Sequence, residues 1–323
     1  ITHLQTKVTE IDQAENGNVA ALVTEDGERV EADVFFDCTG FSSLLMQKTL
    51  GVKFESFKSN LFNDSAVVMP TPADDNPRPE TVSFAMSNGW CWKIPLTNRY
   101  GNGYVYSSDF ISDDDAETEL RTLLGTLDSD EPARHLKMNV GQLEKHWEKN
   151  CIGLGLSQGF IEPLEATALL LVQVAIEIFA SSYESAGFTD KYRDEYNVKI
   201  HERFERVRDY IVAHYKLNTR DDSEYWKANR ENMELSDSLR RILDVWYRRG
   251  DLTAEVQKQN IESHFTSLSW HCLLAGYGAF PPMASDQPGK GDLYKEQNIE
   301  SFLQRCSLNF RSHRENLEFC SDT

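Results

Sequence analysis

Residues 30–40 read VEADVFFDCTG, a run that is mostly apolar up to Phe36 and ends in the small residues Thr39 and Gly40. A short apolar run bounded by turn signals predicts a buried strand. Ligands in α/β folds bind beyond the carboxyl ends of such strands, where a glycine lets a flat ring or a phosphate approach the backbone. The run therefore predicts an α/β fold with a ligand near Gly40. A plain exit from strand to loop explains the same residues equally well.

A second sheet is predicted after this strand. Strand-like stretches occupy residues 65–69, 81–86 and 104–107, and glycine-containing turns are expected at 88–89 and 101–103. Short strands that follow one another across such turns favour antiparallel pairing. We expect a mostly antiparallel sheet.

The segment 89–95 of this second sheet reads GWCWKIP. Side chains two residues apart lie on the same face of a strand, so Trp90 and Trp92 should form one aromatic wall. Pro95 cannot donate to the ladder and should end the pairing. An aromatic pair that only packs the sheet is the commoner explanation of such a pattern.

Residues 161–168 read IEPLEATA and precede an apolar run that extends to about Tyr183. Pro163 suits the first turn of a helix, where the missing N–H is not needed. The free N–H groups and the positive dipole end of a helix start can hold a flavin phosphate, a carboxylate or a halide. Any capped helix has the same geometry.

Composition narrows the functional classes. A formal charge of -19 at pH 7 disfavours nucleic acid and anionic membrane surfaces as partners. The six cysteines form no CxxC pair, and we expect reduced thiols in a cytoplasmic protein. His201 and His214 lie on one predicted helix, where histidines are more often surface or interior residues than ligands, so no metal is expected.

Three motifs carry a resemblance to a known family. Trp90, Trp92, Ile94 and Pro95 match the WxWxIP signature of flavin-dependent halogenases within the flavin monooxygenase superfamily. The stretch 160–167 (FIEPLEAT) is similar to the FxEPLEST segment of the same proteins, and residues 37–40 (DCTG) resemble a flavin-domain element of the superfamily. The order and spacing agree, and weaker likeness covers the rest of the chain. The sequence resembles the FAD-dependent tryptophan halogenase family.

The resemblance implies a flavin-monooxygenase-like α/β sheet fused to an antiparallel sheet and a helical C-terminal region. We expect residues 1–187 to form the remainder of a FAD- and halide-binding domain, and residues 188–323 a helical region on the substrate side. The family's GxGxxG motif and catalytic lysine have no counterpart in this sequence, so the resemblance implies an N-terminally truncated chain whose isolated form is inactive.

The resemblance also implies an activity. Members of the family use reduced FAD, oxygen and a halide ion to make a hypohalous oxidant, which halogenates an electron-rich aromatic such as tryptophan, another indole or a phenol. A separate flavin reductase supplies the FADH2, and a homodimer is compatible with the resemblance. The rivals left open are a flavin-dependent aromatic monooxygenase and a noncatalytic ligand-binding protein.

The resemblance places roles on single residues. Glu165 is the expected catalytic carboxylate, because a carboxylate can hydrogen-bond the oxidant or take the proton of the cationic ring intermediate. Glu162 is the second candidate, and capping of the helix start explains it equally well. The other predicted contacts are the halide site at Thr167 and Ala168, cofactor contacts at Gly40, Gly159, Thr167 and Ala168, the barrier motif Trp90, Trp92, Ile94 and Pro95, and substrate contacts at Trp270 and His271.

The sequence departs from the tryptophan enzymes at three places. Ala166 and Ala168 stand where those enzymes usually have Ser and Gly, so one hydroxyl is lost and the backbone amide at Ala168 is kept. Trp270 and His271 stand where they tend to have a tyrosine pair. These residues argue against tryptophan itself and favour a different indole or a phenol, and all three stay open as substrates.

Overall fold

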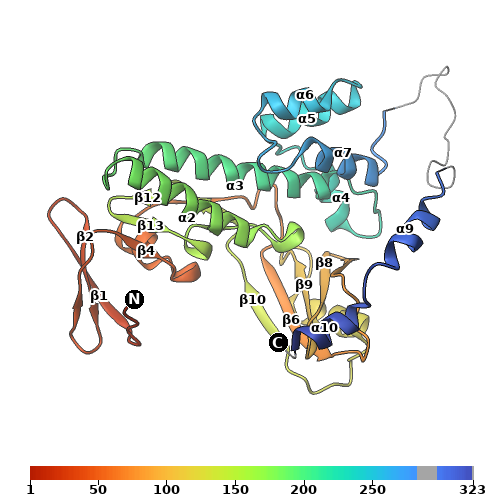
Figure 1. Cartoon of the computed structure of the whole chain (residues 1–323), viewed down its shortest axis with the longest axis horizontal. Coiled ribbons are helices and arrows are strands. Elements are labelled where there is room, and N and C mark those ends of the chain that lie inside the picture. Colours follow the sequence, from red (N-terminus) through yellow and green to blue (C-terminus); the bar gives the residue numbers. More distant parts are fainter. Residues whose placement is uncertain (282–296, 322–323) are drawn as a thin grey trace. The chain divides into compact units, whose positions relative to one another are not determined.

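The computed structural model describes residues 1–281 and 297–321, and these residues form two compact units (Figure 1). The first unit comprises Ile1–Asp64 and Lys137–Gly278. The second comprises Ser65–Leu136 and the described part of Ala279–Thr323. The predicted domain boundary, between residues 187 and 188, falls inside the first unit. The two units thus differ from the predicted division, which stays a prediction.

The strands of the first unit form three small sheets. Their orders are β1-β2-β3, β12-β13-β4 and β14-β11-β5. The strands are β1 (Val8–Gln13), β2 (Val19–Thr24), β3 (Arg29–Val30), β4 (Phe35–Asp37), β5 (Phe54–Ser56), β11 (Gly141–Leu143), β12 (Trp147–Glu148), β13 (Cys151–Gly153) and β14 (Gly159–Phe160).

The strand predicted over residues 30–38 is divided in the structure. Val30 closes the hairpin sheet as part of β3, and only Phe35–Asp37 forms β4, which pairs in parallel with β13. Phe35 is buried, whereas Phe36 is 44% exposed. The parallel pair and the helices beside it confirm the predicted α/β class.

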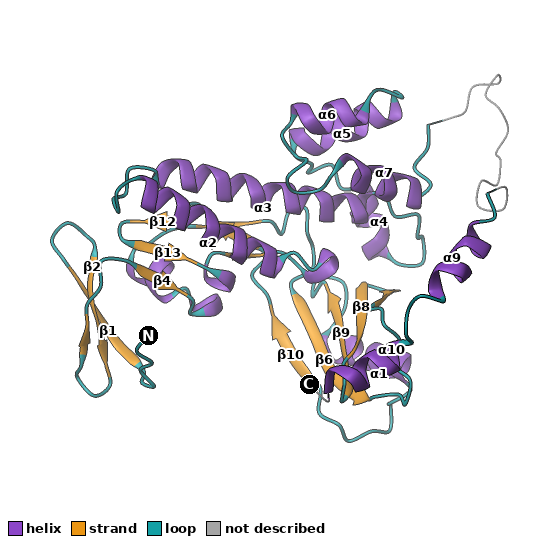
Figure 2. Cartoon of the chain, viewed as in Figure 1, coloured by secondary structure: helices purple, strands orange, loops and turns teal. Residues whose placement is uncertain are grey.

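The helices of the first unit follow the sheets in the sequence. They are α2 (Ala168–Ser185), α3 (Arg193–Lys216), α4 (Glu224–Glu231), α5 (Asp237–Tyr247), α6 (Leu252–Lys258) and α7 (Ser267–Gly276). Helices α2 and α3 lie side by side next to the β12-β13-β4 sheet, as Figure 2 shows. Aromatic contacts join these layers: Phe179 of α2 meets the rings of Phe36 and Trp147, with centroids 5.2 and 4.9 Å apart.

Helix α2 is apolar on almost every side. Leu171, Ala175 and Phe179 are buried, while Leu169 is 83% exposed. Its 18 residues have a mean hydropathy of 1.3, so it could cross a membrane by length and composition alone. A helix that packs on a core meets the same criterion, and the expectation of no membrane partner stays a prediction.

The second unit contains the predicted antiparallel sheet. Its order is β10-β6-β9-β8-β7, and the pairs β6–β9, β9–β8 and β8–β7 are antiparallel. Helix α1 packs on it, and Tyr104, Tyr106 and Leu120 are fully buried in the core that they share. The elements are β6 (Ser65–Pro72), β7 (Val82–Met86), β8 (Gly89–Pro95), β9 (Arg99–Tyr106), α1 (Asp113–Leu124), β10 (Arg134–Lys137), α9 (Ile299–Ser307) and α10 (His313–Ser321).

The turn predicted at residues 101–103 is wrong, because both glycines lie inside β9. Trp92 pairs with Gly103 across the β8–β9 ladder, and its indole covers the glycine Cα. A Cβ on Gly103 would lie 2.1 Å from Cζ2 of Trp92. Gly103 is therefore required by the tryptophan that faces it.

Gly103→Ala should destabilise the protein, because the new methyl group would displace the Trp92 indole. Overpacking of this kind costs about 1–3 kcal/mol in the free energy of unfolding. Gly101→Ala is the matched control in the same strand, since a Cβ there would meet only Leu96 Cδ1 at 4.0 Å. Urea unfolding of both variants measures the difference, and equal stabilities would contradict the packing described here.

Candidate active site

The segment FIEPLEAT connects β14 to α2 through one tight turn. Pro163–Glu165 forms a single 3-10 turn with Pro163 in its first position, and Ala166 ends it with φ of 53°. Helix α2 then begins at Ala168, with Thr167 before it. The apolar helix predicted after this segment is confirmed as α2. The place predicted for Pro163 in its first turn is wrong, because left-handed Ala166 ends a separate turn before α2 begins.

Glu162 is buried in a network of side chains. Its Oε2 accepts hydrogen bonds from Asn63 Nδ2 at 2.8 Å and from the Tyr215 hydroxyl at 2.7 Å. Tyr225 in turn donates to Oδ1 of Asn63 at 2.9 Å. The Glu162 side chain makes no capping hydrogen bond to the turn that follows it, so the capping alternative is wrong. Glu162 instead ties the segment to α3 and α4.

Glu165 is half-buried, with 32% of its side chain exposed, and it contacts the last turn of α3. Its Oε1 lies 2.8 Å from Nε2 of His214, and Nδ1 of His214 lies 3.2 Å from the hydroxyl of Tyr277. Burial, together with the negative charge of Glu165, raises the pKa of Tyr277. The tyrosine therefore keeps its proton at neutral pH.

Aromatic rings surround His214. Tyr210 meets the imidazole edge-on at 5.5 Å and stacks on Phe265 at 3.7 Å. Trp270 meets the same Tyr210 ring at 4.9 Å. Burial, with a further contribution from Glu165, raises the pKa of Tyr210. This arrangement limits the rotation of the imidazole.

The predicted substrate contacts lie together on α7. Trp270 is 1% exposed and belongs to the aromatic group beside His214, and its Nε1 is buried without a hydrogen-bond partner among the described residues. His271 is half-buried: Nδ1 lies 2.7 Å from the carbonyl oxygen of Ser267, and the ring meets Trp246 edge-on. Trp270 thus lies in the same cluster as Glu165, and a substrate role for either residue stays a prediction.

The start of α2 presents unsatisfied donors. The first backbone hydrogen bond of α2 runs from the N–H of Leu171 to the carbonyl oxygen of Thr167. The amides of residues 168–170 therefore have no acceptor within the helix. Thr167 is 6% exposed, and its Oγ1 is buried without a hydrogen-bond partner in the described part of the chain. A buried hydroxyl beside free amides suits a bound anion.

A cavity of about 200 Å³ adjoins this helix start, and its lining is mainly apolar. Ala168, Gly159 and Phe160 line it, together with Leu169 and Phe204. Gly159 also touches the chain closely: a Cβ there would lie 2.7 Å from both Gly141 O and Phe204 Cε1. That packing explains the glycine by itself, and a cofactor contact there stays a prediction.

Gly40 follows the end of β4 with φ of 67°, and nothing lies within 4 Å of the position of a Cβ. The adjacent Asp37 is fully buried. Its Oδ2 accepts from the amides of Leu45 and Met46, and its Oδ1 accepts from the Thr39 hydroxyl at 2.6 Å. Asp37 thus shapes the loop while Gly40 leaves open space beside the backbone.

The tryptophan pair belongs to the second unit. Trp90 and Trp92 lie on one face of β8 with ring centroids 5.8 Å apart, as predicted from their spacing. Trp90 is 5% exposed and Ile94 is 36% exposed. Pro95 ends the strand and lines a cleft of about 400 Å³ next to α10.

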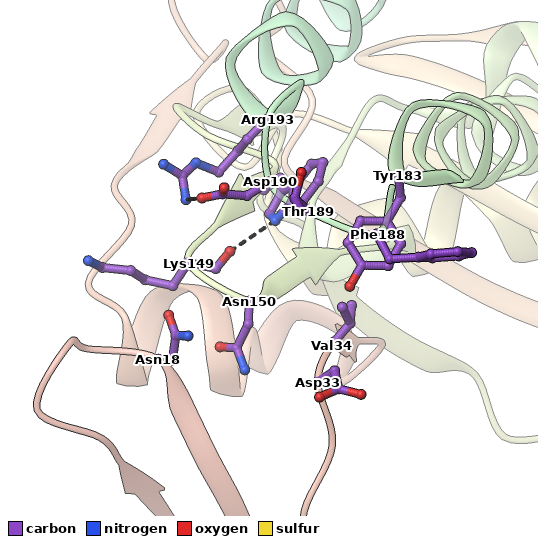
Figure 3. Close-up of a pocket in the computed structure, with 11 residues that line it drawn as sticks. Asn18, Asp33, Val34, Lys149, Asn150, Tyr183, Phe188, Thr189, Asp190 and Arg193 are labelled. Atoms are coloured by element: carbon purple, nitrogen blue, oxygen red, sulfur yellow. Dashed lines mark hydrogen bonds and ion pairs between the residues drawn. The ribbon is translucent and has the colours of Figure 1, made fainter. Parts of the chain in front are cut away.

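A different cavity, of about 150 Å³, lies in the first unit beside the end of α2, and Figure 3 shows its lining. Arg193 pairs with Asp190 at 2.8 Å, and Trp147 Nε1 donates to the carbonyl oxygen of Lys149 at 2.9 Å. None of the predicted site residues is among its lining residues.

Sequence reasoning missed the partners of the two carboxylates. His214 was assigned no role, and Tyr215, Tyr277 and Asn63 were not singled out at all. His214 was interpreted as a surface or interior histidine, because nothing local in the sequence links it to Glu165 or Tyr215 to Glu162. Within residues 1–281 and 297–321, no group of three His, Cys, Asp or Glu side chains is placed to hold a metal ion.

Tyr215→Phe should lower the free energy of unfolding by about 2–3 kcal/mol, because it removes a hydrogen bond to a buried carboxylate. Tyr247→Phe is the control, since that tyrosine is 48% exposed, and it should be neutral. Urea unfolding tests both. A neutral Tyr215→Phe would show that the Glu162 network does not stabilise the fold.

Thr167→Val should raise the free energy of unfolding in the absence of ligands by about 1 kcal/mol, because it removes a buried hydroxyl that has no partner. Thr49→Val is the contrasting control: the Thr49 hydroxyl donates to Leu44 O at 2.8 Å, and its loss should destabilise. Thermal unfolding without halide or FAD compares them. Equal destabilisation of the two variants would contradict the claim that the Thr167 hydroxyl has no hydrogen-bond partner.

Comparisons with known proteins agree with the motifs. The family model described as tryptophan halogenase matches residues 1–288. Over 291 residues the chain is 35% identical to the 7-chloro-L-tryptophan 6-halogenase KtzR of Kutzneria sp. (strain 744), a match that covers 88% of this chain and 55% of that protein. The chain thus spans about half the length of the curated relatives it matches.

Solved structures agree as well. The crystal structure of the tryptophan 6-halogenase SttH from Streptomyces toxytricini matches with a TM-score of 0.86 and 30% identity over 98% of this chain and 66% of its own. BrvH, a flavin-dependent halogenase from Brevundimonas sp. BAL3, matches with a TM-score of 0.81 and 32% identity over 98% and 64%. The resemblance predicted from the motifs is confirmed, and the chain belongs to the tryptophan halogenase family.

Proposed function

We propose that the intact protein is a FAD-dependent halogenase that places a halogen on an electron-rich aromatic ring. Family membership supports this activity. The observation that carries it is the Glu165 carboxylate, held at 2.8 Å by His214 within an aromatic cluster and three residues before the anion-suited start of α2. No feature of the described residues favours a different reaction.

The residues near α2 suit the cofactor and the halide that the family uses. The Thr167 hydroxyl and the amide of Ala168 would hold a halide ion, and the open space beside Gly40 would accept part of the flavin. When bound, reduced FAD would supply electrons to oxygen, and oxygen would be the oxidant that converts the halide to hypohalous acid. The cavity lined by Gly159 and Phe160 adds apolar surface next to these groups.

Glu165 would act on the oxidant and on the ring. A half-buried carboxylate can hydrogen-bond hypohalous acid and orient its halogen toward one carbon. It can then accept the proton that leaves that carbon as aromaticity is restored. Trp90 and Trp92, with Ile94 and Pro95, are proposed as the barrier that keeps the substrate away from the flavin.

The substrate proposed is an indole or a phenol. The relatives named above include enzymes whose names specify tryptophan or chlorotryptophan. Trp270 and His271 replace the tyrosine pair expected in tryptophan enzymes, which favours a different ring. We propose that a separate flavin reductase supplies the FADH2 and that the protein acts in the cytoplasm. A homodimer is compatible with these proposals.

The intact protein should brominate a member of a panel of indoles and phenols when it is supplied with FAD, NADH, a flavin reductase and bromide. Mass spectrometry detects the bromine isotope pair. Glu165→Gln should lower turnover at least about 100-fold, because the amide cannot accept the proton from the ring. Glu177→Gln, on the α2 surface and bound only to Gln173, is the control and should leave turnover unchanged.

Three outcomes separate the alternatives. Bromination that is lost in Glu165→Gln supports the activity and the site together. Hydroxylated product without halogen would indicate an aromatic monooxygenase, and binding of an aromatic without turnover would indicate a noncatalytic binding protein.

A further inference from the structure

The imidazole of His214 has a partner on each nitrogen. Nε2 lies 2.8 Å from Oε1 of Glu165, and Nδ1 lies 3.2 Å from the Tyr277 hydroxyl. A carboxylate can only accept hydrogen bonds, so the proton of a neutral His214 must be on Nε2. Nδ1 is then an acceptor, and the protonated Tyr277 donates to it. The chain of donors runs from Tyr277 through His214 to Glu165.

The ring of His214 cannot turn freely away from this arrangement. Tyr210 and Tyr277 meet it edge-on, with ring centroids 5.5 and 5.8 Å from its own. Tyr210 is held in turn by Phe265 and by its hydroxyl, which donates to Ser269 O at 3.1 Å. The donor that faces Glu165 therefore has a defined position and direction.

The two oxygens of Glu165 differ in their surroundings. Oε1 is engaged by His214, whereas Oε2 has no hydrogen-bond partner among the described residues. The side chain is 32% exposed, so it is partly open to solvent. A glutamate without a second contact would sample several rotamers, and a hydrogen bond at one oxygen restricts where the other points.

We propose that His214 is the positioning residue of Glu165: its Nε2–H holds Oε1 so that Oε2 is the oxygen that meets the reactants, and Tyr277 sets the tautomer that makes this possible. The inference rests on the proposed function, in which Glu165 is the essential carboxylate. His214 itself need not touch the substrate. Its role resembles that of the residue that orients a catalytic base by a hydrogen bond.

Activity assays test this role with two substitutions in the intact, FAD-loaded protein. His214→Leu removes the donor, and we expect kcat to fall about 10–100-fold while KM changes less than about twofold. His214→Gln offers an amide N–H to the carboxylate and should recover most of the lost kcat. A role in packing alone predicts the reverse order, with leucine tolerated better than glutamine beside the aromatic rings.

A ligand-free measurement separates this inference from the proposed activity. Ring-15N labelling of the eight histidines, with the His214 signals assigned by their loss in His214→Gln, should show the Nε2–H tautomer without FAD or halide. Tyr277→Phe should shift the Nδ1 signal. A His214 protonated only on Nδ1 overturns the inference. A His214→Leu enzyme with wild-type kcat alongside an inactive Glu165→Gln overturns it as well. Absence of halogenation in the wild type overturns the proposed function instead and leaves the tautomer result standing.

Discussion

Two neighbouring residues of α3 hold the two carboxylates of the segment that leads into α2. His214 contacts Glu165, and Tyr215 donates to Glu162. Successive side chains on a helix point about 100° apart. Tyr215 can therefore point into the interior while His214 points toward the half-exposed Glu165. The path from β14 to α2, and with it the position of Thr167, depends on this double attachment.

The two glutamates carry the same chemical group but have different roles, because their surroundings differ. Glu162 is 1% exposed and is engaged by Asn63 and Tyr215, so its carboxylate contributes to the fold. Glu165 follows three residues later, is held at one oxygen and has 32% of its side chain exposed. A buried carboxylate requires such hydrogen bonds to offset its desolvation, whereas a partly solvated one can remain reactive.

The second unit shows a different constraint, that of close packing. Trp92 lies flat on Gly103, and Trp90 lies beside it on the same face of β8. Large aromatic rings cover a strand closely only where the facing residue has no side chain, which is why a glycine occurs in the middle of β9. The WxWxIP motif on β8 therefore also requires a glycine at the facing position of β9.

The sequence by itself determined the features that depend on neighbours along the chain. The period of two placed Trp90 and Trp92 on one face, and the apolar run after IEPLEATA predicted α2. Only the tertiary structure decided which groups the glutamates meet, because His214 lies 49 residues beyond Glu165 and Asn63 lies 99 residues before Glu162. Helical periodicity records that a side chain is buried but not which partner it meets, since that partner is chosen by the packing of distant elements.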